Sequence, residues 1–274
     1  DCTAEAPRLT ISVTRLEQLS PALLELGCPA RVYIPLEEVS RLESLPGEGP
    51  EWSAVLPRVW RDRDEPALRT LLERARALGF TGVLIGNLGH LPLVRGLNFH
   101  LYGDYGLNVF NSRSLAYLKD KGLASACVSF ELRFAQIRDM PKVLPTEAIV
   151  YGRLPLMITE NCLVQNETGC RLDRQGPCVP EDGPCRCGQP NVLVDRTGAA
   201  FPLLPAYGHR TEIQNSKPLY LADRPEHRRL GLAYARLRFT TETAEECVSV
   251  VQNYLDAAPA AGDFTRGLYE RGVE

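Results

Sequence analysis

The feature that most constrains the fold is a regular alternation of short β-branched runs with longer amphipathic stretches along almost the whole chain. This alternation is typical of repeated strand–helix units, whose strands pair in a parallel sheet. We predict eight strands, at residues 9–13, 31–36, 54–59, 82–86, 107–111, 126–131, 148–157 and 235–240. Amphipathic helices are predicted at residues 15–27, 65–80, 112–124 and 244–258.

Eight such units in 274 residues predict an α/β fold of the (β/α)8 TIM-like barrel type. The alternative, a doubly wound sheet, more often stops at five or six strands. We expect residues 1–274 to form a single barrel domain, and the abrupt polar start suggests a fragment of a longer protein. The sequence has neither an apolar run of about 18 residues nor a leader, so we expect no membrane span and a cytoplasmic location.

The alternation of strands and helices is interrupted once. Residues 158–234 form a long connection between the seventh and eighth predicted strands. A connection of that length is unusual and is often functional. This one follows the carboxyl end of a barrel strand, which is the end where the active sites of barrel enzymes are built. We expect residues 158–217 to form a metal-binding excursion over that end. Two apolar runs around the turn-forming residues 195–198 predict a β-hairpin within it.

Five of the nine cysteines lie in this excursion, at Cys162, Cys170, Cys178, Cys185 and Cys187. Their spacing matches neither a zinc ribbon nor a bacterial ferredoxin, but the glycines and prolines between them allow tight turns around a centre. Clustering in one segment of a large chain favours a metal site, with His209 as a further ligand. Structural disulfides and an incidental group of reduced thiols are the alternatives.

Several longer segments resemble one known family. "YGRLPLMITENC", "LVDRTGAAFPL", "NSKPLYLAD", "FTRGLYERGVE" and the upstream "LNVFNSRSLAYLKDKGLASACVSFEL" are similar to the collagenase-like peptidase family, number thirty-two among peptidases of unknown catalytic type. The likeness runs from about residue 9 and is strongest to the C-terminal barrel of long members. It therefore implies further domains of a parent chain as partners.

The resemblance implies two different activities. The family name implies proteolysis, but several members are implicated in oxygen-independent hydroxylation of bases in ribosomal or transfer RNA, or of a ubiquinone precursor, with cysteine-bound iron-sulfur clusters. The ligands of those clusters map onto Cys162 and Cys170 and onto a pair among Cys178, Cys185 and Cys187, of which we choose Cys178 and Cys187. Relatives carry a cysteine near His209, so a Cys3His site, and zinc instead of iron-sulfur, remain alternatives.

Proteolysis finds little support in the residues themselves. None of the four histidines, His90, His100, His209 and His227, lies in a known catalytic motif, and no H-E-x-x-H is present. We therefore expect an iron-sulfur enzyme that hydroxylates an RNA base or a related aromatic substrate. A peptidase and a non-catalytic binding module with structural zinc are the alternatives.

Polar residues at the predicted strand ends are the candidate substrate-binding and catalytic groups. We select Asn108, Asn111, Glu131 and Arg153, with Asn87 and Arg133 as neighbours. Asn111 could instead cap the next helix, and Glu131 could form a rim ion pair. Arg153 interrupts an apolar run, so we expect it to anchor substrate or cofactor.

The formal net charge is −3, so the chain as a whole does not attract the phosphates of RNA. A local basic surface would therefore have to bind an RNA partner. The excursion carries a set of arginines that could form a basic collar around the metal, or could simply be solvated: Arg171, Arg174, Arg186, Arg196 and Arg210.

Overall fold

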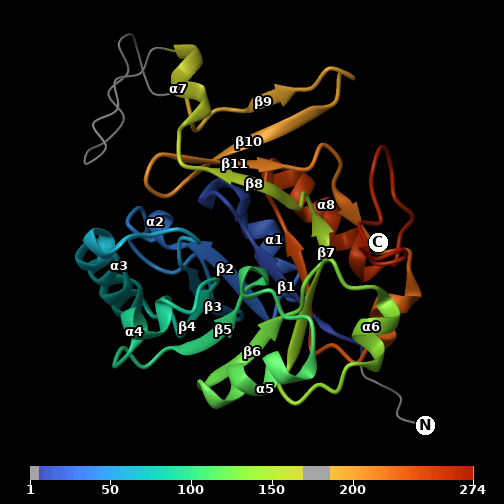
Figure 1. Ribbon diagram of the computed structural model, residues 1–274, viewed down its shortest axis with the longest axis horizontal. Helices are drawn as coiled ribbons and strands as arrows, with labels where there is room; N and C mark the ends of the chain where they lie inside the picture. The colour runs from blue at the N-terminus through green and yellow to red at the C-terminus, as the bar shows by residue number, and fades with distance from the viewer. Residues whose placement is uncertain (1–5, 169–185, 274) are drawn as a thin grey trace. The chain divides into compact units, whose positions relative to one another are not determined.

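The computed structural model describes residues 6–168 and 186–273 (Figure 1). The chain divides into two compact units. One comprises Asp1–Gly152 with Leu219–Glu274, and the other comprises Arg153–Pro218. Cys170, Cys178, Cys185, Arg171 and Arg174 lie outside the described residues.

The first unit is a closed barrel of eight parallel strands, which confirms the predicted fold class. The sheet runs in the order β7-β13-β1-β2-β3-β4-β5-β6, and the pairing of β6 with β7 closes it. A short strand, β12 (Leu219–Tyr220), adds antiparallel to β7. The barrel strands are β1 (Arg8–Ser12), β2 (Arg31–Pro35), β3 (Glu51–Val55), β4 (Gly82–Ile85), β5 (His100–Gly103), β6 (Leu123–Cys127), β7 (Thr146–Gly152) and β13 (Tyr234–Arg238).

Helices and single turns connect these strands (Figure 1). The predicted helix at 15–27 is divided, because Ser20 accepts a hydrogen bond from Leu23 N and Pro21 begins a new helix there. The helices are α1 (Pro21–Glu25), α2 (Leu36–Val39), α3 (Glu65–Leu78), α4 (His90–Val94), α5 (Ser112–Asp120), α6 (Phe134–Asp139) and α8 (Ala244–Leu255). The 3₁₀ turns are η1 (Leu16–Gln18), η2 (Asp62–Asp64), η3 (Tyr105–Leu107) and η4 (Pro225–Arg229).

The fifth barrel strand differs from the prediction. It is formed by His100–Gly103, whereas we predicted residues 107–111. The apolar run after Gly103 enters the turn η3 instead, and Asn108 then adopts a left-handed conformation with φ of 51°. Of the predicted strand, only Val109 forms a β-bridge, and its partner is Val128, the residue that follows β6. A left-handed residue cannot continue a strand, so the pattern of apolar residues misled the prediction.

The seventh strand also ends earlier than predicted, at Gly152. A Cβ at Gly152 would lie 2.0 Å from the Arg238 carbonyl oxygen, and the φ of Gly152 is 116°, so only glycine fits. The chain leaves the barrel there, and the rest of the predicted strand forms β8 (Pro155–Thr159) of another sheet.

The second unit contains a four-stranded antiparallel sheet in the order β8-β11-β10-β9. Besides β8 it comprises α7 (Leu163–Thr168), β9 (Asn191–Val194), β10 (Ala200–Ala206) and β11 (Arg210–Gln214). β9 and β10 form a hairpin. Its turn is held by Asp195 Oδ1, which accepts hydrogen bonds from Thr197 N at 2.8 Å and Ala199 N at 3.0 Å.

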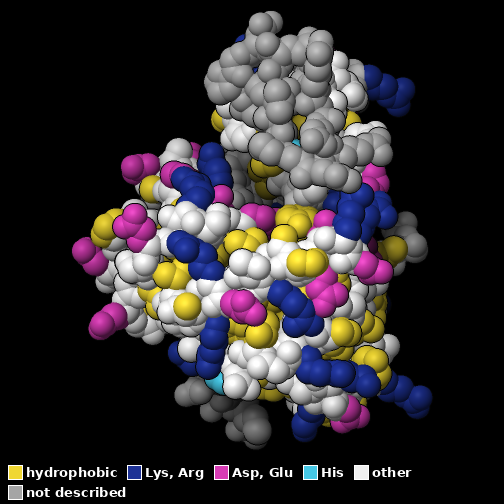
Figure 2. Space-filling view, turned by 90° about the vertical axis from the view of Figure 1, so that its left-hand side faces the viewer, with side chains coloured by type: hydrophobic (Ala, Val, Ile, Leu, Met, Phe, Trp, Pro, Cys, Tyr) yellow, Lys and Arg dark blue, Asp and Glu magenta, His cyan; other side chains and the backbone are white. Residues whose placement is uncertain are grey.

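The outside of the barrel carries no extended field of one sign on the face seen in Figure 2, where acidic, basic and hydrophobic side chains are interspersed. Within the described ranges, the helices are too short or too polar to cross a membrane.

Candidate active site

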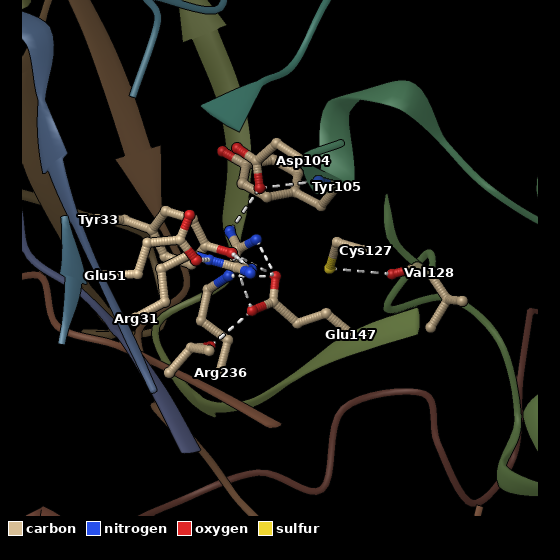
Figure 3. A network of polar contacts seen from close by, with 10 residues as sticks. Arg31, Tyr33, Glu51, Asp104, Tyr105, Cys127, Val128, Glu147 and Arg236 are labelled. Atoms are coloured by element: carbon tan, nitrogen blue, oxygen red, sulfur yellow. Dashed lines mark hydrogen bonds and ion pairs between the residues drawn. The ribbon is translucent and has the colours of Figure 1, made fainter. Parts of the chain in front are cut away.

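The interior of the barrel holds a buried network of charged side chains (Figure 3). At its centre, Arg236 of β13 donates from Nε to Glu147 Oε2 at 2.9 Å and from Nη1 to Asp104 Oδ1 at 2.6 Å. Its Nη2 also donates to Glu147 Oε2. The other oxygen of Glu147 accepts from Thr10 Oγ1 at 2.6 Å and from the Tyr33 hydroxyl at 3.2 Å. Residues from β1, β2, β7 and β13, with the residue that follows β5, thus form one network around the Arg236–Glu147 pair.

Arg236 keeps its charge in this interior. Its side chain is 1% exposed, and burial by itself would lower its pKa. The carboxylates of Glu147 and Asp104 outweigh that effect and raise the pKa above its usual value. A buried charge of this kind requires all its partners, because the loss of one leaves an uncompensated ion in a low-dielectric interior.

A second ion pair lies nearer the amino ends of the barrel strands. Arg31, the first residue of β2, donates from Nε to Glu51 Oε2 at 3.0 Å and from Nη1 to the Tyr33 hydroxyl at 2.9 Å. Its guanidinium carbon lies 3.4 Å from the centroid of the Tyr102 ring, and the Tyr102 hydroxyl also donates to Glu51. Tyr33 therefore links this pair to the Arg236 cluster through the packed interior.

The network reaches the carboxyl end of the barrel at Asp104, which directly follows β5. There Asp104 Oδ1 also accepts from Tyr105 N at 2.8 Å. The guanidinium carbons of Arg58 and Arg238 lie 5.6 Å and 5.9 Å from the centroid of the Tyr105 ring, and the Phe130 ring lies 5.7 Å from it. We call this group, with Ser12 at the end of β1, the barrel mouth, because active sites of such barrels are built at this end.

The three asparagines predicted for the site have local roles at turns. Asn87 Oδ1 accepts from Gly89 N at 2.8 Å. Asn108 is the exposed residue that ends η3. Asn111 is exposed and caps α5, where its Oδ1 accepts from Ser114 N at 3.0 Å. The side chains of Asn87 and Asn111 therefore satisfy neighbouring backbone groups.

The charged residues predicted for the site are also dispersed. Glu131 is partly buried beyond β6, and its N–H donates to Ser129 Oγ at 3.4 Å. Arg133 is exposed and precedes α6. Arg153 lies outside the barrel strand in which we predicted it, because β7 ends at Gly152. Its Nη1 donates to the carbonyl oxygens of Asn215, at 3.1 Å, and of Ser216, so it ties together the two ends of the second unit.

In the second unit, a pocket of about 80 Å³ is lined by three of the predicted ligands: Cys162, Cys187 and His209. The remaining lining is largely apolar, with Val164, Leu203, Leu204 and Pro205 among its members. Local structure holds two of the three donors. Cys162 precedes α7, where Leu163 N donates to Thr211 Oγ1 at 3.0 Å. His209 stands in a left-handed turn, with φ of 60°, directly before β11.

Arg210, next to His209, ties this turn to the end of β8. Its Nη2 donates to Glu160 Oε2 and its Nη1 to the Tyr207 carbonyl oxygen, both at 3.0 Å. Its side chain is 5% exposed, so it does not belong to a solvent-facing basic collar. Arg186 and Arg196 are exposed.

Within residues 6–168 and 186–273, no three histidine, cysteine or acidic side chains are gathered closely enough to hold a metal ion. Three of the five clustered cysteines fall outside those ranges, so the choice of four ligands stays a prediction. In the barrel unit, burial raises the pKa values of Cys28, Cys127 and Cys247.

None of the residues in the barrel network was among the predicted site residues. One signal was available, because polar residues recur with a period of two in several strands, as in Thr10 and Ser12, or Arg236 and Arg238. A period of two places both members of a pair on one face of a strand. In a barrel strand with an apolar outer face, that face must be the interior.

A family model described as Peptidase family U32 matches residues 50–191, just over half of the chain. Among solved structures, the U32 peptidase Mk0906 is 10% identical, with a TM-score of 0.46, and the match covers 87% of this chain and 95% of that one. Thiamine phosphate pyrophosphorylase from Pyrococcus furiosus is 8% identical, with a TM-score of 0.39 and coverage of 91% and 97%. No curated protein matches the chain significantly.

Proposed function

This chain belongs to peptidase family U32, and from that premise we propose that it is an iron-sulfur enzyme that hydroxylates an RNA base, or a related aromatic substrate, without oxygen. The observation that carries the proposal is the pocket shared by Cys162, Cys187 and His209. Two thiols and an imidazole in a largely apolar setting are a donor set suited to a soft metal centre.

The residues present fit such a centre in their chemistry. Cys162 and Cys187 would bind it together with cysteines from the segment 169–185, and His209 would be a further ligand or would orient one. Zinc is the alternative metal for the same donors. When bound, an iron-sulfur cluster supplies one-electron redox chemistry, whose potential depends on burial and on hydrogen bonds to sulfur.

The chain's own contribution is to place and orient the substrate. The apolar residues of the pocket, such as Leu203, would shield a centre bound by the thiols from water. The ion pair of Arg210 with Glu160 holds the turn that carries His209. The barrel mouth offers charged groups and aromatic rings on a rigid scaffold, as binding of a polar aromatic substrate requires.

A thiol peptidase is the second candidate, favoured by the presence of Cys162 and His209 in one pocket. The other histidines contact other groups. His90 Nε2 lies 3.1 Å from the Pro57 carbonyl oxygen, and His227 Nδ1 lies 2.5 Å from that of Arg224. His100 is exposed and contacts Glu51.

Anaerobic reconstitution with iron and sulfide tests the proposal. The wild-type chain should bind both and develop visible charge-transfer absorption, and Cys162→Ala and Cys187→Ala should each lose most of the bound iron. Cys28→Ala, which alters a thiol of the barrel unit, is the matched control and should load normally. Equal losses in all three variants would point to unfolding, and bound zinc without reducible iron would contradict the redox function.

Two further measurements separate the candidate activities. Base hydroxylation, followed by mass spectrometry of RNA digests from cells that depend on this chain, should need Cys162. Hydrolysis of gelatin by the metal-free protein, lost in both Cys162→Ala and His209→Ala, would establish the peptidase instead.

A further inference from the structure

We propose that the barrel mouth binds a single nucleotide, whose base stacks on Tyr105 and whose phosphate is held by Arg58 and Arg238. Asp104 would accept a hydrogen bond from an amino group on the edge of the base. The inference rests on the proposed function, because it names how the barrel would hold an RNA base. It concerns residues of the barrel unit alone.

The first observation is the direction of Ser12 and Arg238. These residues are partners in register on the adjacent parallel strands β1 and β13. Each stands two positions after a residue of the interior network, Thr10 in β1 and Arg236 in β13. Because side chains alternate along a strand, Ser12 and Arg238 also face inward, one layer closer to the carboxyl end.

Ser12 leaves a polar atom without a partner at this position. The residue is 8% exposed, and its hydroxyl makes no hydrogen bond with any residue that the structure describes. Buried hydroxyls in native proteins are almost always hydrogen-bonded, so an orphaned one needs an explanation. An oxygen or nitrogen of a bound ligand beside Arg238 would supply the partner.

The second observation is the concentration of guanidinium groups around one ring. Arg58 and Arg238 both approach Tyr105, and Arg58 Nη1 lies 3.5 Å from the Tyr105 hydroxyl. Guanidinium groups suit phosphate because they can donate two parallel hydrogen bonds to it. Arg238 ends the eighth barrel strand, and barrels of this type frequently bind phosphate in that region.

The third observation concerns the free side of Asp104. Within the described part of the chain, the hydrogen bonds to its carboxylate, from Arg236 and from Tyr105 N, both go to Oδ1. Oδ2 lies on the side of Gly86, where a Cβ would approach it to 4.0 Å. A carboxylate fixed through one oxygen presents the other as an acceptor, which suits an exocyclic amino group.

The aromatic rings complete the site. Tyr105 and Phe130 pack at 5.7 Å with an angle of 50° between their planes. Close backbone contact holds Tyr105 in place, because a Cβ on the next residue, Gly106, would lie 2.6 Å from the Gly86 carbonyl oxygen. Unpaired bases of RNA are commonly recognised by stacking on such rings. The combination of ring, anion-binding groups and acceptor is the chemistry of a nucleotide with an amino group on its base.

Calorimetric titration of the whole chain with defined ligands tests the proposal. Adenosine monophosphate should bind more tightly than adenosine or inorganic phosphate alone. It should also bind about tenfold more tightly than inosine monophosphate, in which a carbonyl oxygen replaces the amino group and would face Asp104. Arg58→Ala and Arg238→Ala should each weaken nucleotide binding by about tenfold or more, and Asp104→Asn should reduce the preference for the amino base.

Arg113→Ala is the control, because Arg113 is exposed on α5. If Asp104→Asn fails to fold, Arg58→Ala still tests the site, since Arg58 contacts the Tyr105 ring from outside the Arg236–Glu147 pair. Equal nucleotide affinity in wild type, Arg58→Ala and Arg238→Ala would overturn the proposal. So would adenosine binding as tightly as its monophosphate.

A competition experiment identifies the source of the nucleotide. A short single-stranded RNA that displaces adenosine monophosphate would support a site for an RNA base. Binding of the mononucleotide without such competition would support a site for free nucleotides and would count against RNA as the substrate. Cys162→Ala should retain nucleotide binding, so a failed cluster reconstitution leaves this result unaffected.

Discussion

Arg236 and Glu147 are joined inside the barrel by two hydrogen bonds from Nε and Nη2 of the guanidinium to a single carboxylate oxygen. The two side chains come from adjacent strands, β13 and β7, and their exposed fractions are 1% and 2%. This pair connects the last two strands of the barrel through its interior, so its integrity should matter to the whole unit.

Glu147→Gln should therefore destabilise the protein by about 3 to 5 kcal/mol, because it leaves the Arg236 charge poorly compensated in a buried site. Urea denaturation followed by circular dichroism measures the loss. The double variant Glu147→Gln/Arg236→Met removes the orphaned charge and should recover part of the stability. If Glu147→Gln costs less than about 1 kcal/mol, other groups in the barrel interior must stabilise the Arg236 charge.

Gly152→Ala should be strongly destabilising. The new Cβ would lie 2.0 Å from the Arg238 carbonyl oxygen, and the φ of 116° disfavours any side chain. The steric conflict should cost more than the roughly 1 kcal/mol expected from a left-handed φ alone. Gly122→Ala is the matched control, since Gly122 has a φ of 86° and no atom within 4 Å of a Cβ. Thermal unfolding of both variants measures the difference, and similar losses would refute a steric role for Gly152.

His90 should make the protein sensitive to acid. Burial lowers the pKa of His90 to about 4 from an ordinary value of 6.5, so the folded state binds this proton less readily than the unfolded state. Its contribution to stability is then complete above pH 6.5 and is lost as the pH falls toward 4. Between pH 6.5 and 5 the loss should be roughly 2 kcal/mol. Denaturant unfolding at both pH values should show a shallower decline for His90→Gln, and an identical decline would contradict the assignment.

Glu37 should act in the opposite direction. This carboxyl lies in α2, directly after β2, and burial together with the neighbouring Glu38 raises its pKa to about 7. The folded state then holds the proton more tightly, so the stability contributed by the protonated form is lost as the pH rises from 4.5 through 7. Glu37→Gln should be more stable than wild type at pH 8 and comparable to it at pH 4.5. The melting temperatures at these two pH values test this, and a destabilised variant at pH 8 would count against it.

Cys127 and Cys247 should resist alkylation in the native protein. Both are fully buried, and burial raises their pKa values, so little reactive thiolate is present at pH 8. Mass spectrometry after iodoacetamide treatment should find both unmodified until denaturant is added. Labelling of either residue at the rate of a free thiol in solution would show that the barrel opens locally.

The sequence by itself determined the fold class of this protein and the place of its cysteines. Eight alternating units are sufficient for a barrel, because the periods of strands and helices are properties of local sequence. The same reasoning failed for the fifth strand, where the apolar run at 107–111 forms a turn and Asn108 adopts a left-handed conformation. It also failed for Arg153, because only the close contact of Gly152 with the Arg238 carbonyl reveals where the chain leaves the barrel.

Only the tertiary structure decided which polar residues meet. Arg236 is 132 residues from Asp104 and 89 from Glu147, and no local pattern couples positions so far apart. Closure of the barrel brings their strands around one interior, where a charge is tolerated only with partners from other strands. In the same way, Cys162 and Cys187 were visible as a cluster in the sequence, but the turn before β11 is what adds His209 to their pocket.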